Sequence, residues 1–361
     1  MIQAICQRLN DMDARGLRGR PGSGVVVGID RDPMAKVTLL LFDDRGELTA
    51  VAKVARNPGV EPALRREGAA MCRLAAEALP SLRAQVPRPL LLERIAGRLV
   101  LASTAVAGAP LTVRYYTPGH VTNADSVAAD FAMAGRWITA LQHETPTATA
   151  TLGEAYQRYV VPVVERYRRL IGGSCWELQL FAAIECGARE LADLQVPTPL
   201  LHGDYAIGNI LVQAGAVAGV VDWELSREAS LPLLDVLKFA ASYSSFLDRA
   251  QPPRADRLRG HPGWSAASKQ WPAPAGWMNL TGFMYGFFGE GWYPDLVRGF
   301  VAEHATRLGL PPSVLPLLIR AFLLDQATVL DNATYASGYR ALLHAVHDAL
   351  TDRAVGSVGA R

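Results

Sequence analysis

Short blocks of apolar residues, separated by turn residues, dominate the first hundred positions of the chain. They cover five stretches: 24–30, 36–42, 48–55, 89–95 and 98–104. Blocks of this length bounded by Gly, Pro, Asn and Asp are typical of β-strands. The segment DDRGE, with Gly46, predicts a hairpin between the second and third strands, and Ala96-Gly97 predicts a turn between the last two. We therefore expect a five-stranded meander.

Helical periodicity appears twice within this first part of the chain. Residues 2–15 form an amphipathic pattern, and a second pattern rich in alanine follows Asn57-Pro58-Gly59 and ends before Pro87 and Pro89. The meander is thus expected to hold one inserted helix and to be preceded by another.

Beyond residue 122 the pattern changes to long helical periods. They cover residues 124–143, 152–171, 176–194 and most of 231–350, with an irregular insert at about 248–276. Two short strands, 209–213 and 216–222, interrupt the helices and flank a turn at Ala214-Gly215. The predicted fold class is α+β, with a small, mostly β lobe at residues 1–105 and a larger, mainly helical lobe at residues 106–361.

Composition narrows the class of protein more than it defines the function. The 36 Lys and Arg nearly balance the 34 Asp and Glu, which gives no electrostatic reason to expect a nucleic acid or a membrane surface as partner. The N-terminus has no long apolar segment, and the four scattered cysteines match no metal-ligand spacing. We expect a cytoplasmic protein with reduced, buried thiols.

Polar residues gather around the two short strands. The segment HGDYAIGNILV holds His202, Asp204 and Asn209, and VVDWE follows with Asp222 and Glu224. A carboxylate in a tight turn, as at Asp204, can orient a hydroxyl group or accept its proton. Asn209 and Asp222 offer the oxygen ligands that Mg²⁺ prefers, and a bound cation explains how the negative charge is tolerated. Together these residues predict a site for one or two Mg²⁺ ions that carry a nucleotide.

This spacing resembles that of the aminoglycoside phosphotransferase and choline kinase-like family, which has the protein-kinase-like fold. The resemblance covers residues 24–245 and implies roles for individual positions. It implies that Asp204 is the catalytic carboxylate, that Asn209 and Asp222 hold Mg²⁺, and that ATP or GTP donates the phosphate. It further implies supporting roles, which fall to three residues: His202, Glu224 and Asp235.

The same resemblance requires a lysine on the third strand and a glutamate on the next helix. AVAKVAR supplies Lys53 and RREGAAM supplies Glu67, although Arg65 and Arg66 are alternative salt partners for Glu67. A lysine within an apolar strand is costly unless it is paired. The resemblance implies that Lys53 binds phosphates and that backbone groups at about Thr104 to Val106 bind the base.

One segment departs from the family pattern. The loop between the first two strands, IDRDPMAK, contains no glycine, whereas a glycine-rich loop lets backbone N–H groups approach phosphate closely. Arg31 or Lys36 could add charge there instead, but we expect both to be solvated at the surface.

The acceptor side of the site is predicted only in outline. Four tryptophans (Trp264, Trp271, Trp277 and Trp292) lie between residues 264 and 292 and either stack on a ligand or pack against helices. Asp325 and Asp331 either meet cationic substrate groups or are surface charges. As candidate substrate residues we single out Trp271, Trp277 and Asp325.

The favoured function is a Mg²⁺-dependent kinase that phosphorylates a small-molecule hydroxyl of an aminoglycoside, sugar or nucleoside-type metabolite. An amino-alcohol kinase of the choline or homoserine type is the nearest alternative. The glycine-free loop motivates a further reading as a non-catalytic binding protein. A serine hydrolase built on His202 is disfavoured because the chain has no G-x-S-x-G motif.

Overall fold

The structure is a computed structural model of the 361-residue chain. It describes residues 1–12, 17, 19–27, 35–77, 79–245, 247, 261–272, 279–329 and 333–358. The chain forms two compact units. Unit 1 comprises Met1–Leu111, His202–Asp204 and Gly208–Arg227, and unit 2 comprises Thr112–Leu201, Tyr205–Ile207 and Glu228–Arg361. The predicted lobe boundary near residue 105 stays a prediction, and we describe each unit by itself.

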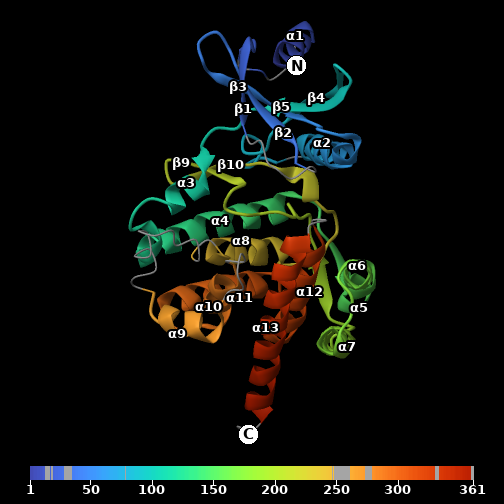
Figure 1. Cartoon of the computed structure of the whole chain (residues 1–361), viewed down its shortest axis with the longest axis vertical. Coiled ribbons are helices and arrows are strands. Elements are labelled where there is room, and N and C mark those ends of the chain that lie inside the picture. Colours follow the sequence, from blue (N-terminus) through green and yellow to red (C-terminus); the bar gives the residue numbers. More distant parts are fainter. Residues whose placement is uncertain are drawn as a thin grey trace. The chain divides into compact units, whose positions relative to one another are not determined.

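Unit 1 is built on the five-stranded antiparallel sheet that the sequence predicts (Figure 1). Its strands are β1 (Ser23–Val27), β2 (Val37–Phe42), β3 (Leu48–Val54), β4 (Pro89–Ile95) and β5 (Arg98–Thr104). The spatial order is β1-β2-β3-β5-β4, so the expectation of a simple meander is wrong in one respect. After β3 the chain passes through helix α2 (Glu61–Ala76) and then forms β4 at the edge of the sheet. The next strand, β5, lies between β3 and β4 and pairs with both.

The two faces of this sheet carry different helices. Helix α1 (Ile2–Asp11) packs Ile5, Cys6 and Leu9 into an apolar cluster with the face that bears Leu39, Ala52 and Val100. Helix α2 (Glu61–Ala76) follows the short 3₁₀ helix η1 (Pro58–Val60) and contacts β4 and β5. At Gly68 of α2 an added Cβ would lie 3.4 Å from Leu101, so α2 packs on the face that bears Leu101. Leu101 pairs with Lys53, whose side chain lies on the face opposite to that of its neighbour Ala52, so α2 and α1 cover different faces of the sheet.

Two hairpins use the tight turns that the sequence predicts. Ala96 and Gly97 have φ of 49° and 80°, and Ala214 and Gly215 have φ of 49° and 78°. Positive φ at both central residues is the type I′ pattern, whose twist matches that of the flanking strands. The second of these turns joins β9 (Ile210–Gln213) to β10 (Ala216–Val220), and β9 also pairs with β6 (Ala109–Pro110).

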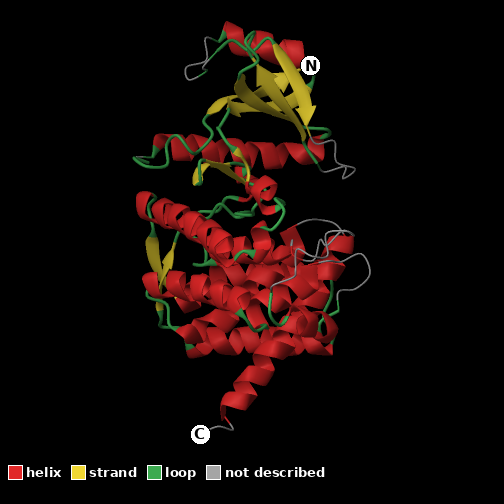
Figure 2. Cartoon of the chain, turned by 90° about the vertical axis from the view of Figure 1, so that its left-hand side faces the viewer, coloured by secondary structure: helices red, strands yellow, loops and turns green. Residues whose placement is uncertain are grey.

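Unit 2 is mainly helical (Figure 2). Its helices are α3 (Leu111–Tyr115, whose first residue belongs to unit 1), η2 (His120–Thr122), α4 (Ala124–Glu144), α5 (Leu152–Ala155), the π-helix η3 (Tyr156–Val160), α6 (Val161–Leu170), α7 (Cys175–Glu190), α8 (Leu234–Ser245), α9 (Trp264–Gln270), α10 (Asn279–Phe288), α11 (Trp292–Arg307), η7 (Pro312–Val314), α12 (Leu315–Val329) and α13 (Ala333–Val358). The pattern at 152–171 thus forms three consecutive helices rather than one. A two-stranded sheet of β7 (Ala148–Thr151) and β8 (Gln195–Thr198), which the sequence did not predict, joins them.

One long apolar helix of unit 2 lies in its interior. Helix α12 contacts α6, α7, α8 and α13. The stretch Pro312–Val329 is long and apolar enough to cross a membrane, but 72% of it is buried inside the protein, which is typical of a core helix. This burial accounts for its hydropathy without a lipid environment.

The cysteines differ from expectation in their burial. All four are free thiols, as predicted, yet only Cys6 is buried, whereas Cys72, Cys175 and Cys186 are exposed. The three exposed positions lie on helices α2 and α7, outside the apolar stripes that face the cores.

Candidate active site

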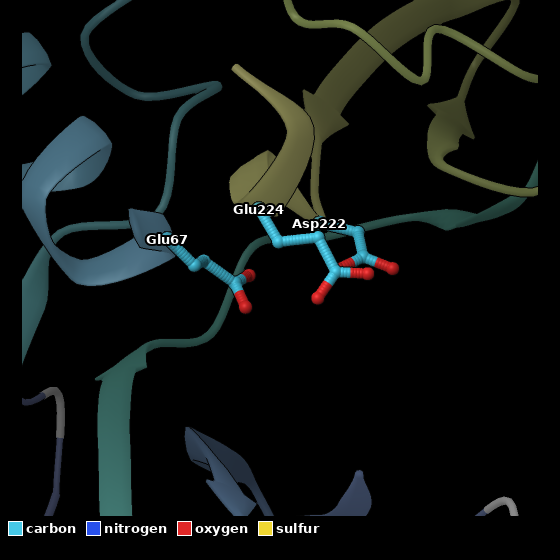
Figure 3. Close-up of side chains that lie close together, drawn as sticks. All are labelled: Glu67, Asp222 and Glu224. Atoms are coloured by element: carbon cyan, nitrogen blue, oxygen red, sulfur yellow. The ribbon is translucent and has the colours of Figure 1, made fainter. Parts of the chain in front are cut away.

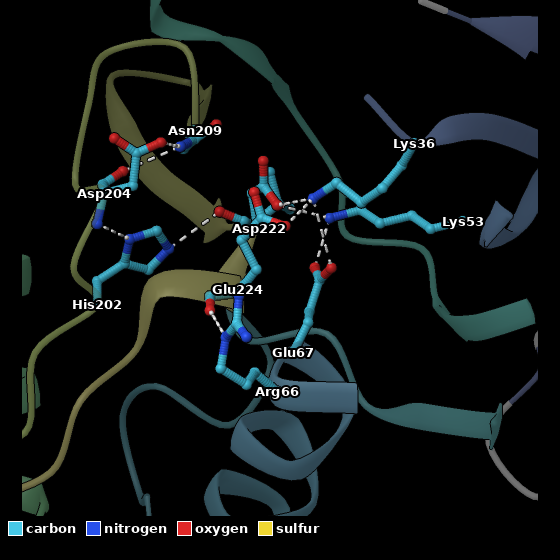
Figure 4. Close-up of polar contacts among 10 residues, drawn as sticks. Lys36, Lys53, Arg66, Glu67, His202, Asp204, Asn209, Asp222 and Glu224 are labelled. Atoms are coloured by element: carbon cyan, nitrogen blue, oxygen red, sulfur yellow. Dashed lines mark hydrogen bonds and ion pairs between the residues drawn. The ribbon is translucent and has the colours of Figure 1, made fainter. Parts of the chain in front are cut away.

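Lys53 lies at the centre of a charged cluster within unit 1 (Figure 4). Its ammonium group forms an ion pair with Glu67 Oε1 of α2 and another, at 2.9 Å, with Asp222 Oδ1. Arg65 instead pairs with Glu61, and Arg66 donates to the backbone oxygen of Glu224, so neither competes for Glu67. The partner that the sequence suggested for Lys53 is therefore the one it contacts.

Lys36 joins the same cluster, which corrects the expectation that it is solvated. Its Nζ lies 2.8 Å from Asp222 Oδ1, 2.6 Å from Glu224 Oε2 and 3.8 Å from Glu67 Oε2. Only 13% of its side chain is exposed. Burial alone lowers the pKa of Lys36, but the three neighbouring carboxylates outweigh it and raise this pKa well above its ordinary value. Arg31 lies outside the described residues.

Asp222 follows β10 with a backbone conformation that few residues other than glycine adopt. Its φ is +70° and its ψ is +62°, in the left-handed region. Burial raises the pKa of its carboxyl, but Lys53 and Lys36 outweigh that effect and hold the pKa well below its ordinary value. Asp222 is thus an anion that two lysines share. Such strain at a charged residue is typical of functional sites.

Three carboxylates converge at this point (Figure 3). One oxygen each from Glu67, Asp222 and Glu224 lies within 4.8 Å of the others, the arrangement expected of residues that could hold a metal ion. Glu67 Oε2 is buried and forms no hydrogen bond with the described residues. Hard carboxylate oxygens with unused capacity suit a divalent cation such as Mg²⁺. The residues present therefore fit the cation that the sequence implied, with Glu67 and Glu224 beside Asp222.

His202 is held by backbone groups on both sides of its ring. Nδ1 accepts the backbone N–H of Asp204 at 3.2 Å, and Nε2 donates to the backbone oxygen of Val221 at 3.0 Å. The ring is fully buried and meets Trp223 edge-on at 4.5 Å. Because backbone groups use both nitrogens, neither is available to activate a serine, and the geometry disfavours the hydrolase reading.

Asp204 and Asn209 are joined directly. The Asn209 amide donates to Asp204 Oδ2 and to the Asp204 backbone oxygen, both at 2.9 Å. Gly203, just before Asp204, has φ of +84°, and a Cβ there would lie 2.0 Å from the backbone oxygen of Leu225. The HGD turn and the segment after Asp222 are therefore in contact, and only glycine permits that approach.

The predicted base-binding segment lies directly after β5. Thr104 donates its backbone N–H to Arg88 and accepts that residue's N–H on its side chain, while Ala105 donates to Thr49. Val106 lies against the backbone of β10, where a Cβ on Gly219 would come within 2.0 Å of it. A cavity of about 630 Å³ adjoins this segment, but its lining includes neither Lys53 nor Asp222.

Several predicted residues belong to unit 2 or to undescribed positions. Asp235 is buried in the first turn of α8, and its role as a brace stays a prediction. Asp325 is 5% exposed and pairs with Arg166 at 3.0 Å, so it is not the surface charge that the sequence suggested. Trp271 is half-buried, and its backbone oxygen accepts a hydrogen bond from Thr281. Trp277 and Asp331 lie outside the described residues.

The sequence missed the part of the cluster that Lys36 and Glu224 form. A signal for Lys36 was present, because it precedes Thr38 by two positions and Thr38 pairs with Lys53 across the hairpin. Alternation along a strand directs all three side chains to one face. Glu224 was expected only to support the loop, whereas its carboxylate contacts Lys36 directly.

With this geometry in view, the comparisons identify the class of protein. A model described as the phosphotransferase enzyme family matches residues 37–269, which is more than half of the chain. The chain belongs to this family, and it is a phosphotransferase that acts on hydroxyl groups. A search of curated proteins gives no match.

Solved structures support the protein-kinase-like fold. A thermostable mutant of aminoglycoside phosphotransferase APH(4)-Ia shares 11% identity and a TM-score of 0.55, covering 96% of this chain and 98% of the other. A putative fructosamine-3-kinase from Thermobifida fusca YX-ER1 shares 14% identity and a TM-score of 0.52, covering 97% and 99%. At these identities the likeness concerns the fold, and it confirms the predicted class: a five-stranded antiparallel sheet with a mainly helical part after it.

Proposed function

We propose that the protein is a Mg²⁺-dependent small-molecule kinase that transfers the γ-phosphate of ATP or GTP to a substrate hydroxyl. The observation that carries this proposal is the convergence of two lysines and two further carboxylates, Glu67 and Glu224, on Asp222, beside the joined pair of Asp204 and Asn209. Positive groups that hold phosphates and carboxylates that hold a cation are the two requirements of phosphoryl transfer.

The sheet offers a surface for the nucleotide base. Val25 of β1 pairs with Leu40 of β2, and Leu40 pairs with Val51 of β3, so the three side chains form a row across the sheet. Val51 lies two residues before Lys53, so this row is on the same face as Lys53. Val25 is 55% exposed, which is high for a valine within a strand. An apolar row beside a phosphate-binding lysine suits a flat base, and backbone groups near Val106 would bind its edge.

The residues of the site divide the reaction between them. Asp204 orients the acceptor hydroxyl and takes its proton, while Asn209 fixes the carboxylate through Oδ2. A bond forms between the acceptor oxygen and the γ-phosphorus, the bond to the nucleoside diphosphate breaks, and Lys53 binds the departing phosphates. Glu67 keeps Lys53 in place by their ion pair. Asp222 would hold Mg²⁺, and the bound ion would neutralise negative charge on the phosphate oxygens.

The acceptor is proposed as a class rather than a compound. The names of the two solved structures refer to an aminoglycoside and to fructosamine, and both are sugar derivatives that carry amino groups. Those names are in line with an aminoglycoside, sugar or nucleoside-type acceptor, whereas a choline- or homoserine-type amino alcohol is the second choice. Free cysteines, three of them exposed, fit a reducing compartment, and we infer a cytoplasmic location.

The proposal predicts that Asp204→Asn abolishes most of the transfer without disturbing the fold. The change keeps the shape and the contact with Asn209 but removes the proton acceptor, which is worth about 10²- to 10⁴-fold in rate. Release of nucleoside diphosphate is measured with ATP and GTP, with and without Mg²⁺, over a panel of aminoglycosides, sugars, nucleosides and amino alcohols. Asp193→Asn, at an exposed position in unit 2, is the matched control and is expected to keep full activity.

A clear result against the proposal is also available. If neither nucleotide is turned over with any acceptor, or if Asp204→Asn matches the wild type, the kinase assignment fails. Mg²⁺-dependent binding of nucleotide without transfer would instead support the non-catalytic alternative that the glycine-free loop suggested.

A further inference from the structure

Lys36 has no counterpart among the roles that the family resemblance implied, yet it makes the densest set of ion pairs in the described part of unit 1. It contacts all three carboxylates of the cluster, two of them at 2.8 Å or less. Lys53 contacts only Glu67 and Asp222. Both ammonium groups share one oxygen, Asp222 Oδ1, so Lys36 and Lys53 lie on the same side of that carboxylate (Figure 4).

The hairpin of β2 and β3 explains this placement. Thr38 pairs with Lys53, and Lys36 lies two residues before Thr38, immediately ahead of β2. Alternation of the strand, continued by one residue, therefore directs Lys36 and Lys53 to the same face. Lys36 also ends the loop stretch IDRDPMAK (29–36), which precedes β2 and contains no glycine. A lysine at the exit of this loop can bring a positive charge to the place where backbone N–H groups approach phosphate in a glycine-rich loop.

The charges of the cluster do not balance by themselves. Three carboxylates face two ammonium groups, which leaves a net charge of −1 if all are ionised. Lys36 donates to Asp222 and Glu224, and these are two of the three residues whose oxygens converge. A divalent cation bound there needs the same lone pairs, so the ammonium group of Lys36 must give them up. Its flexible four-carbon stem allows this, and phosphate oxygens are the natural new partner.

We propose that Lys36 is a second phosphate-binding lysine, which binds carboxylate oxygens of the metal site when the site is empty and transfers to the nucleotide's phosphates when a divalent cation enters. This inference rests on the proposed function and deepens it. Lys36 supplies the positive charge that the backbone N–H groups of a glycine-rich loop offer to phosphate, and the phosphate chain is bound by two lysine side chains.

The test measures binding rather than turnover. Isothermal titration calorimetry compares adenosine with a non-hydrolysable ATP analogue in the presence of Mg²⁺, for the wild type and for Lys36→Met. Loss of one charged hydrogen bond weakens binding of the analogue by about 10- to 100-fold, while binding of adenosine is unchanged. Lys36→Arg retains charge and is expected to restore most of the affinity. Lys269→Met, at an exposed lysine of α9, is the matched control and binds both ligands as the wild type does.

A second readout has the opposite sign. Without nucleotide, Lys36→Met is expected to bind Mn²⁺, detected by its paramagnetic resonance signal, about 10-fold more tightly than the wild type, because no ammonium group competes for the carboxylates. Tighter metal binding together with weaker nucleotide binding is a pattern that a purely structural lysine does not produce. Lys36→Gln, which keeps a hydrogen-bond donor without the charge, serves the same purpose if the methionine variant does not fold.

The outcomes separate this inference from the function it rests on. If the wild type binds neither adenosine nor the ATP analogue, and neither guanosine nor the matching GTP analogue when these are titrated instead, the proposed function fails and the role of Lys36 fails with it. If the wild type binds the analogue with Mg²⁺ and both uncharged variants bind it within about twofold, only the role of Lys36 is overturned. Unchanged Mn²⁺ affinity in both variants overturns the competition between Lys36 and the cation.

Discussion

At the scale of single residues, the site depends on two backbone conformations that most amino acids avoid. Asp222 has φ of +70°, and Gly203 has φ of +84°. The first conformation directs a carboxylate toward two lysines, and the second brings the HGD turn against Leu225. Both residues lie in the motifs HGDYAIGNILV and VVDWE, so the motif specifies backbone geometry as well as chemistry.

The contact at Gly203 leads to a paired prediction. Gly203→Ala places a Cβ 2.0 Å from the Leu225 backbone oxygen, so the turn must move. We expect a loss of about 3 kcal/mol or more in the free energy of unfolding. Gly46→Ala, at a hairpin turn with φ of +77° and no atom within 4 Å, carries only the left-handed strain of about 1–2 kcal/mol.

Urea unfolding of the two variants measures this difference. Gly203→Ala is also expected to impair catalysis, because Asp204 follows directly, whereas Gly46→Ala keeps the wild-type rate. Equal losses of stability in the two variants would show that the approach of Leu225 is not what requires glycine.

Single residues were predictable where the motif fixes them and not where pairing between distant segments decides. Asp204, Asn209 and Asp222 were selected from spacing alone, and the roles assigned to them stay predictions. Lys36 was placed at the surface because its partners are 186 and 188 residues away in the chain. Only the register of the hairpin and the position of β10 show that its charge is buried.

At the scale of elements, unit 2 contains a junction at the start of α7. Glu177 forms a capping box with Ser174 and also accepts hydrogen bonds from Tyr167 of α6 and Arg340 of α13. Its side chain is fully buried. Burial raises the pKa of Glu177, but Arg340, Ser174 and Tyr167 outweigh it and hold this pKa at about 2. One carboxylate thus ties three helices together.

We predict that Glu177→Gln lowers the free energy of unfolding by about 1–3 kcal/mol at neutral pH, because hydrogen bonds to a charged group are weakened. A carboxyl whose pKa is lowered in the folded state stabilises fully above its ordinary pKa of 4.5 and loses this effect as the pH falls toward about 2. The gap between wild type and variant should therefore close over that range in urea unfolding.

The control lies on the same helix. Glu185 pairs with Arg189 at the surface, where its side chain is 58% exposed, and Glu185→Gln should change stability by no more than about 0.5 kcal/mol. If the Glu177 variant behaves like this control at neutral pH, the junction does not carry the stability assigned to it.

Elements were predicted better than their arrangement. Every strand of the five-stranded sheet and helices α1, α2, α4 and α7 arose from local periodicity, which depends on each segment's own sequence. The order β1-β2-β3-β5-β4 and the pairing of β7 with β8 depend on contacts between segments. The alternation of residues within a strand does not encode which neighbour it pairs with.

At the scale of the whole molecule, two buried histidines make stability sensitive to mild acid. His261 and His304 are each 4% exposed. Burial, joined at His304 by the charge of Arg307, lowers the pKa of both to about 4 from the ordinary 6.5. The unfolded chain takes up protons below pH 6.5 that the folded protein resists until about pH 4. Stability is therefore complete above 6.5 and falls as the pH drops through this window.

The double variant His261→Gln and His304→Gln tests this dependence. It is expected to be less stable than the wild type at neutral pH, because two packed rings are lost, but to show a flatter decline between pH 6.5 and 4. Unfolding free energies are measured for both proteins at matched pH values. Parallel declines would mean that other groups cause the acid sensitivity.

The family and the fold define the reaction but not the acceptor. Of the predicted substrate residues, Asp325 is buried against Arg166, and Trp277 lies outside the described residues. Phosphoryl transfer needs a fixed set of charges, which leaves a recognisable spacing in sequence, whereas acceptor recognition uses side chains of any type on variable segments. The substrate roles of Trp271, Trp277 and Asp325 therefore stay predictions.

The most direct test of the central claim follows the phosphate itself. Phosphorus NMR of a mixture of enzyme, Mg²⁺, ATP or GTP and an acceptor distinguishes the γ-phosphate, inorganic phosphate and a phosphate ester. The kinase assignment predicts that the γ-phosphate signal is replaced by that of an ester in the wild type, and that Asp204→Asn or removal of Mg²⁺ suppresses the change. Persistence of the γ-phosphate, or its conversion to inorganic phosphate alone with every acceptor class, would contradict the account.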